Sequence, residues 1–176
     1  MSTGASYRAW LGLGGNIDDP VASMGKALRM LDERADTNVI AVSAVYRTPP
    51  WGKTDQAWFH NACAEIRTSL QPLELIATCL EVERSLKRVR LERWGPRIID
   101  IDILAMQDEA GRAIIMNEAA LELPHPRMHE RAFVLVPLSD IAPSLEIADK
   151  TVADWNIGTE QIGIEKARTN AGWWRK

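Results

Sequence analysis

One stretch near the middle of the chain limits the possible folds more than any other. It reads Arg-Trp-Gly-Pro-Arg-Ile-Ile-Asp-Ile-Asp-Ile-Leu over residues 93–104. The Gly-Pro pair ends the preceding element, and the β-branched run after it predicts a strand up to about Met106. Side chains two residues apart on a strand point the same way, so Asp100 and Asp102 share one face and the isoleucines share the other. We expect a strand anchored in the core by isoleucine, with two carboxylates on its open face.

The carboxylate pair predicts a cation site beside bound phosphate. Like charges at this spacing repel each other, and a bound hard cation relieves the repulsion. Cationic side chains crowd the approach to the strand: Arg84, Lys87, Arg88, Arg90, Arg93 and Arg97. Some of them complement the dipole at the end of a helix, but the later ones continue past the expected helix end. An isolated Asp-x-Asp is more often solvated surface, whereas the arginine cluster here favours a polyphosphate site.

Composition restricts the class of protein. A length of 176 residues suits one domain with a proper core better than two. We expect a single domain over residues 1–176, with a core over about 8–140 and a C-terminal extension over about 141–176. A net charge of -3 argues against a general nucleic-acid or membrane-surface binder and favours small-molecule ligands. A monomer is favoured over an oligomer.

The cysteines and the N-terminus predict a cytoplasmic location. Cys63 and Cys79 are the only two cysteines, and they lie in apolar segments without a metal-type spacing. Buried reduced thiols are the simplest interpretation, and they are typical of a reducing compartment. The first seven residues carry no apolar core of a signal peptide, and no apolar run approaches membrane-spanning length.

Periodicity predicts the order strand, helix, strand, strand, helix, strand. The expected strands cover 8–13, 37–46, 59–67 and 99–106, and the expected helices begin at Pro20 and Pro72. Asp18 or Asp19 would cap the first helix. This order is typical of an α+β, ferredoxin-like (split βαβ) antiparallel sheet with both helices on one face.

Several local expectations accompany this fold. The apolar stripe predicted for the second helix consists of Leu73, Ile76, Ala77 and Leu80. Later in the chain we expect a short return strand over 114–116, a helix over about 128–139 and a helical turn over 151–155. The pattern after residue 158 is weak, so that Trp173 and Trp174 could pack or be exposed.

An aromatic ring and an amide are expected beside the carboxylates. If Ala62 and Ile66 face the core, then Phe59 and Asn61 face the opposite side, where Asp100 would lie. The loop over residues 47–58 contains a Pro-Pro pair that stiffens it before any ligand contact. A purely structural loop is nearly as well supported by this segment alone.

Several segments in one order closely resemble the 6-hydroxymethyl-7,8-dihydropterin pyrophosphokinase family of folate biosynthesis. They are Leu-Gly-Gly-Asn at 13–16, Tyr-Arg-Thr-Pro-Pro at 46–50, Phe-x-Asn-Ala at 59–62, Arg-Val-Arg at 88–90, the stretch at 93–104, and Pro-His-Pro at 124–126 followed by Arg131 and Phe133. The resemblance implies an ATP-dependent diphosphotransferase that moves pyrophosphate from ATP to the hydroxymethyl group of the pterin and releases AMP.

The resemblance also implies a role for each matching residue. Asp100 and Asp102 would hold two Mg²⁺ ions, and the catalytic set would be Arg88, Arg90, Arg97, Asp100 and Asp102. The ATP-binding set would be Glu83, Arg88, Arg97, Ile103, His125 and Arg131. The pterin-binding set would be Thr48, Pro49, Pro50, Trp51, Phe59, Asn61 and Phe133.

Two other functions remain open at this point. A ferredoxin-like module that binds nucleotides or RNA without catalysis would need a basic sheet face, and Asp100 and Asp102 would repel RNA there. An ordinary kinase that transfers only the γ-phosphoryl group would be expected to carry a Gly-rich phosphate loop, which the sequence lacks.

Overall fold

The computed structural model of the chain describes residues 4–50, 54–86 and 98–176. The predictions made for Trp51, Arg88, Arg90 and Arg97 lie outside these described residues. Among the described helices, none is long and apolar enough to cross a membrane.

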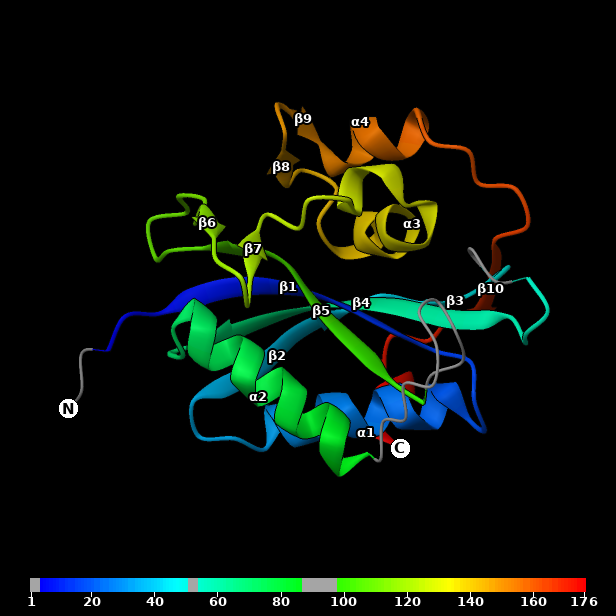
Figure 1. Cartoon of the computed structure of the whole chain (residues 1–176), viewed down its shortest axis with the longest axis horizontal. Coiled ribbons are helices and arrows are strands. Elements are labelled where there is room, and N and C mark those ends of the chain that lie inside the picture. Colours follow the sequence, from blue (N-terminus) through cyan, green and yellow to red (C-terminus); the bar gives the residue numbers. More distant parts are fainter. Residues whose placement is uncertain (1–3, 51–53, 87–97) are drawn as a thin grey trace.

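An antiparallel sheet forms the middle layer (Figure 1). Its strands are β1 (Tyr7–Gly15), β2 (Thr37–Val42), β3 (Val45–Thr48), β4 (Phe59–Thr68), β5 (Asp100–Gln107) and β10 (Glu165–Arg168). They are ordered β10-β3-β4-β1-β5, and β2 pairs with β4 beside β3. Each of these pairings is antiparallel. The predicted α+β class with an antiparallel sheet is confirmed.

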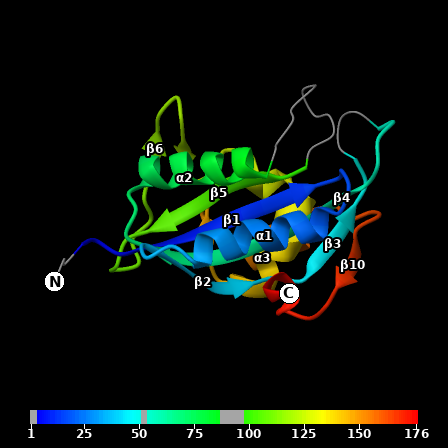
Figure 2. The ribbon, with the colours of Figure 1, turned by 90° about the horizontal axis from the view of Figure 1, so that it is seen from below.

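Helices cover both faces of this sheet. The helices α1 (Pro20–Asp32) and α2 (Pro72–Ser85) lie on one face, and α3 (Ala132–Ile141) and α4 (Val152–Ile157) lie on the other (Figures 1 and 2). Two short hairpins, β6 (Met116–Asn117) with β7 (Glu122–Leu123) and β8 (Glu146–Ile147) with β9 (Lys150–Thr151), and two 3₁₀ turns, η1 (Met128–Glu130) and η2 (Trp173–Arg175), complete the described elements.

Alternation along the strands supplies a separate core to each layer. Leu11 on β1 belongs to the large cluster under α1 and α2, whereas its neighbour Trp10 belongs to the smaller cluster under α3. Cys63 on β4 lies in the second cluster, and Ala62 and Ala64 on either side of it lie in the first. Successive side chains on a strand point to opposite faces, which explains how one strand serves both cores.

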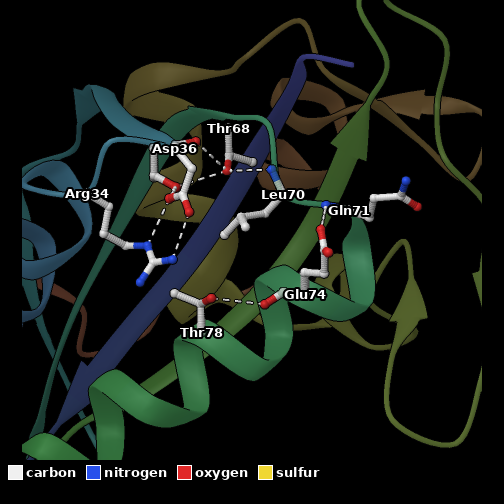
Figure 3. A network of polar contacts seen from close by, with 8 residues as sticks. Arg34, Asp36, Thr68, Leu70, Gln71, Glu74 and Thr78 are labelled. Carbon is white, nitrogen blue, oxygen red and sulfur yellow. Dashed lines mark hydrogen bonds and ion pairs between the residues drawn. The ribbon is translucent and has the colours of Figure 1, made fainter. Parts of the chain in front are cut away.

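Capping residues set the starts of α1 and α2. Asp19 accepts a hydrogen bond from the backbone N–H of Ala22 at 3.0 Å, and Pro20 occupies the first helical position, as predicted. At α2, Glu74 accepts from the N–H of Gln71 at 2.8 Å, one half of a capping box. Figure 3 shows this corner, where Thr68 also donates to the backbone oxygen of Asp36 at 3.0 Å.

The apolar stripe predicted for α2 was wrong except at Ile76, which is partly buried and packs against the main core. Leu73 is 46% exposed and Leu80 is 37% exposed. The buried residues are instead Pro72, Leu75, Thr78, Cys79, Val82 and Glu83. Both sets follow helical spacing, and the buried set includes a carboxylate that apolar patterning excludes. That carboxylate has a partner in the core, because Glu83 accepts from the backbone N–H of Ile101 at 2.8 Å.

The single strand predicted over 37–46 is two strands, β2 and β3. Ser43 interrupts it, and its hydroxyl accepts a hydrogen bond from the backbone N–H of Cys63 at 2.8 Å. Serine side chains compete with backbone groups for hydrogen bonds and can so interrupt a strand. A pattern of β-branched residues does not reveal this hydrogen bond. The first strand ends at Val42 and the second begins at Val45.

Two further boundaries differ from prediction. The return strand over 114–116 is reduced to an isolated bridge between Gln107 and Ala113 and to the two residues of β6. Ile115 is 74% exposed, so that no burial favours a strand there. The helix predicted over 128–139 is divided into η1 and α3, because Arg131 between them has an extended backbone.

The C-terminal residues return to the sheet. Strand β10 pairs with β3 at its edge, and the expected helical turn is α4. Trp173 and Trp174 are both buried and belong to the cluster under α1 and α2. The Arg29 side chain of α1 donates to the backbone oxygen of Trp174 at 2.6 Å. Of the two alternatives left by the sequence, packing is correct.

Candidate active site

A pocket lies over the sheet on the face that carries α3. Its lining comes from β1, β3, β4, β5 and the start of α3: Gly12, Leu13, Gly14, Thr48, Pro49, Phe59, Asn61, Ala62, Cys63, Asp100, Asp102, Arg131, Phe133 and Val134. Eight residues of this lining belong to the predicted catalytic and binding sets: Thr48, Pro49, Phe59, Asn61, Asp100, Asp102, Arg131 and Phe133. The fold therefore gathers residues that are widely separated in the sequence.

Strand β1 provides a floor of bare backbone between two polar walls. Gly14 pairs with Asn61 on β4 and with Asp100 on β5, so these three residues form one row across the sheet. Gly12 forms the next row with Cys63 and Asp102. Paired residues on neighbouring strands share a face. The two glycines thus separate an amide and a thiol from two carboxylates.

Gly14 is required by a close approach. A Cβ at this position would lie 2.6 Å from the side-chain oxygen of Asn61 and 3.6 Å from the backbone oxygen of His60. Any larger residue would push the Asn61 amide away or fill the floor. The sequence reasoning missed Gly12 and Gly14 as lining residues, and the strand predicted over 8–13 ended before Gly14, whereas β1 continues to Gly15. Their two-residue spacing within a strand was the available signal.

The alternation predicted for β5 is confirmed. Ile99, Ile101 and Ile103 are buried in the main core, while Asp100 and Asp102 line the pocket. The two carboxylates supply oxygen ligands of the kind that Mg²⁺ prefers. Within the described ranges, no group of three or more His, Cys, Asp and Glu side chains is arranged for a metal. A cation here would take its remaining ligands from water or from phosphate oxygens, which is the usual arrangement for protein-bound Mg²⁺.

Two residues of the predicted ATP-binding set lie on the core side of the sheet. Glu83 is 2% exposed and accepts from the backbone N–H of Ile101 on β5. Ile103 is buried in the same cluster. Neither residue is part of the pocket lining. Glu83 instead fixes the strand at the residue between the two aspartates.

A hydrogen bond orients the amide on the opposite wall. The side-chain nitrogen of Asn61 donates to the hydroxyl of Thr48 on β3 at 2.7 Å, and both residues are buried. The amide oxygen therefore lies on the side of Gly14. An amide presents one donor and one acceptor group, so this bond makes Asn61 a hydrogen-bond acceptor toward the floor of the pocket.

A cation and an aromatic ring form the upper wall. The guanidinium of Arg131 lies 5.6 Å from the centroid of the Phe133 ring. Burial lowers the pKa of Arg131, and the negative charges of Asp102 and Asp100 oppose that shift. Arginine keeps its proton at any physiological pH, so the wall is positive and faces the carboxylates.

His125 lies outside the pocket lining and within the electrostatic reach of Arg131. Its backbone N–H donates to the oxygen of Leu104 at 2.7 Å, and its Nδ1 accepts from the N–H of Arg127 at 3.2 Å. Burial, together with the positive charges of Arg131 and Arg127, lowers the pKa of His125 to about 4. The imidazole is therefore neutral near pH 7, as an accepting nitrogen requires.

The fold and the pocket are those of a protein that binds a small molecule. Its concave site joins apolar and aromatic walls to a few fixed polar groups, as small-molecule sites in α+β proteins do.

The chain belongs to the 7,8-dihydro-6-hydroxymethylpterin-pyrophosphokinase (HPPK) family, whose profile matches residues 10–143. Relatives named 2-amino-4-hydroxy-6-hydroxymethyldihydropteridine pyrophosphokinase support the assignment. The Methylorubrum extorquens protein is 48% identical over 159 residues, which cover 90% of this chain and 98% of that relative. The Bacillus subtilis protein is 39% identical over 164 residues, which cover 93% of this chain and 92% of that relative.

Solved structures of the same family share the fold. A Plasmodium falciparum HPPK-DHPS wild-type structure with STZ-DHP matches at a TM-score of 0.68 with 17% identity. The match covers 90% of this chain and 44% of the Plasmodium chain. At this identity the likeness concerns the fold alone, and this chain spans less than half the length of that protein.

Proposed function

We propose that this chain transfers pyrophosphate from ATP to the hydroxymethyl group of 6-hydroxymethyl-7,8-dihydropterin and releases AMP, as a step of folate biosynthesis. Membership of the pyrophosphokinase family supports this reaction. The observation that carries it is the arrangement across β1, where a glycine floor separates the Asn61 amide from the Asp100 and Asp102 carboxylates. One wall suits a flat heterocycle, and the other suits a metal-bound polyphosphate.

The proposed reaction exchanges one phosphorus–oxygen bond for another. The hydroxymethyl oxygen of the pterin forms a bond to the β-phosphorus of ATP, and the bond from that phosphorus to the oxygen bridging to the α-phosphate breaks. AMP leaves with the bridging oxygen, and the hydroxyl proton passes to solvent. Such a transfer depends on positioning and charge stabilisation more than on a strong base. The fixed walls of the pocket meet that requirement.

We assign the pterin to the wall formed by β3, β4 and α3. The oxygen of Asn61 would accept a hydrogen bond from the edge of the heterocycle, whose rings would pack between Phe59 and Phe133. Thr48 and Pro49 would close the side of the pocket. Pro50 and Trp51 stay predictions from the family resemblance.

We assign the polyphosphate to the wall formed by β5 and Arg131. Asp100 and Asp102 would hold two Mg²⁺ ions, which when bound neutralise charge on the triphosphate. Arg131 would contact phosphate oxygens through charge-assisted hydrogen bonds. His125 would contact the phosphates of the nucleotide. Glu83 would contribute by holding β5 in position through its hydrogen bond with Ile101. Arg88, Arg90 and Arg97 are assigned to the triphosphate by resemblance alone.

Fold subclass, domain organisation and location complete the proposal. The order β3-β4-β1-β5, with α1 and α2 on one face, supports the ferredoxin-like arrangement. The free, buried Cys63 and Cys79 support a reducing compartment such as the cytoplasm.

A single domain over 1–176, a monomeric state and an absence of nucleic-acid binding stay predictions. The alternative of a non-catalytic RNA-binding module is disfavoured by the family and by the carboxylates in the pocket.

The deciding experiment separates the products of the reaction. The protein is incubated with ATP, Mg²⁺ and the reduced hydroxymethylpterin, and the nucleotides are resolved by chromatography. AMP should appear only when the pterin is present. Formation of ADP would indicate transfer of the γ-phosphoryl group alone, and an absence of pterin-dependent turnover would contradict the proposed function.

A further inference from the structure

The C-terminal segment lies against the side of the pocket. Residues 163–174, called the brace below, include β10, which pairs with β3 through Glu165 opposite Arg47 and Lys166 opposite Tyr46. Strand β3 carries Thr48, and Pro49 follows it, and both residues line the pocket. Thr48 and Pro49 are called the pocket wall. The brace lies beyond residue 143, where the family match ends.

Gly163 contacts the pocket wall directly. A Cβ at Gly163 would lie 2.8 Å from Cγ of Pro49, which is closer than packed carbon atoms approach. A second contact joins the brace to β3. The Arg47 guanidinium of β3 lies 3.7 Å from the Glu165 carboxylate of the brace and 4.6 Å from the centroid of the Trp58 ring. The outer side of Pro49 therefore rests on the brace.

The other end of the brace is anchored in the core. Trp173 donates from its indole nitrogen to the backbone oxygen of Ser43 at 2.9 Å, at the break between β2 and β3. Trp174 accepts from Arg29 of α1, and a Cβ at Gly25 of that helix would lie 3.3 Å from the Trp174 backbone. Both tryptophans are buried. The brace is thus fixed beyond each end of β3.

We propose that the brace positions the pocket wall, and that Gly163 is a positioning residue for pterin binding. The inference rests on the proposed function, because the wall is assigned there to the pterin. A displaced wall weakens the contacts of the heterocycle, while the carboxylate wall on β5 lies on the far side of β4 and β1 from β3. The brace therefore affects the affinity for the pterin and leaves the affinity for ATP unchanged.

The test compares two glycines with nearly the same φ angle. Gly163 has φ of +79° and Gly111 has φ of +80°, but nothing lies within 4 Å of a Cβ at Gly111. Gly163→Ala and Gly111→Ala therefore both place an alanine at positive φ, and only the first meets Pro49. The dissociation constants for the pterin and for ATP are measured by calorimetry, with KM, kcat and Tm for each variant of the full chain.

We expect Gly163→Ala to raise the Kd and KM for the pterin by about tenfold, with kcat and the Kd for ATP within about twofold of wild type. Gly111→Ala should leave the pterin constants unchanged. Equal pterin affinity in the two variants would overturn the proposal, as would an equal loss of pterin and ATP affinity. A lower Tm in both variants with a pterin effect in one alone would support it.

A double substitution identifies Pro49 as the contact. Pro49→Ala removes the Cγ atom that the new side chain would meet, so adding Gly163→Ala to that variant should not weaken pterin binding further. Full additivity of the two changes would contradict a direct contact. Wild-type protein that binds no pterin would refute both the proposed function and this inference. Wild-type protein that binds the pterin, with equal pterin affinity in the two glycine variants, would refute this inference alone.

Discussion

The side chains of Asn61 and Thr48 are joined by a hydrogen bond of 2.7 Å across two neighbouring strands. The amide nitrogen is the donor, so the amide oxygen is left on the side of the glycine floor, 2.6 Å from where a Cβ of Gly14 would be. A ligand in this pocket meets an acceptor whose direction is set before it binds. Thr48 therefore contributes to recognition by fixing the orientation of Asn61.

Replacing Thr48 by valine should weaken pterin binding while the shape of the side chain is kept. The Asn61 amide then loses its partner and can rotate, and a lost buried hydrogen bond of about 1–2 kcal/mol corresponds to about tenfold in Kd. Fluorescence titration with the pterin measures the effect. Thr48→Ser keeps the hydroxyl and should bind within about threefold of wild type; equally weak binding by both variants would contradict the orienting role.

Asp100→Asn and Asp102→Asn should each lower kcat/KM by at least about a hundredfold, because each removes one charged metal ligand from the pocket. Circular dichroism should remain native, since both side chains lie on the pocket face rather than in the core. Asp108→Asn provides the matched control, because that carboxylate pairs with Arg112 outside the pocket. Activity near wild type in both pocket variants would exclude the metal role.

Glu83→Ala should destabilise the protein by about 2–4 kcal/mol, because it leaves the buried N–H of Ile101 without its carboxylate partner and opens a cavity. Urea unfolding measures this change. Glu83→Gln retains an acceptor oxygen and should recover a large part of the loss, and Glu81→Ala on the exposed face of the same helix should cost less than about 0.5 kcal/mol. Equal stability of the Glu83→Ala and Glu81→Ala variants would show that Glu83 does not anchor β5.

His125 should make the fold less stable in weak acid. Its pKa is lowered from 6.5 to about 4 in the folded protein, so the unfolded chain binds more protons between these two values. Stability is unaffected by this group above pH 6.5 and falls as the pH drops toward 4. At pH 4.5 the loss should be about 2 kcal/mol after allowance for partial exposure.

The comparison of His125→Asn with wild type isolates this effect from other titrating groups. Asparagine offers an accepting oxygen to the N–H of Arg127 and has no proton to gain. Urea midpoints at pH 7.5 and pH 4.5 should therefore differ less in the variant than in wild type. The same acid sensitivity in both proteins would contradict a buried, neutral His125.

Alternation made the central part of the site predictable. Counting residues along two strands predicts that four side chains share one face of the sheet, because a strand has only two faces. These are Phe59, Asn61, Asp100 and Asp102. A helix has no such restriction. The sequence of α2 contains two sets of residues at helical spacing, and either could be the buried one. The set that is buried contains Glu83, whose partner Ile101 on β5 cannot be inferred from neighbouring residues.

Contacts between distant segments explain the other differences. The break at Ser43 depends on a hydrogen bond to Cys63, and the burial of Trp173 depends on a bond back to Ser43. No window of neighbouring residues contains both partners of either bond. The segment after residue 158 therefore carried little signal, although it packs on both the sheet edge and α1.

The paired glycines of β1 leave the layer between sheet and α3 incomplete. Elsewhere on that face Trp10, Leu104 and the side chains of α3 fill the space, whereas Gly12 and Gly14 contribute no side chain of their own. A flat heterocycle seated there would occupy the volume that side chains fill in the rest of the layer. In the proposed function, the bound pterin would therefore complete the packing of the smaller hydrophobic core, and catalysis would take place only in the fully packed protein.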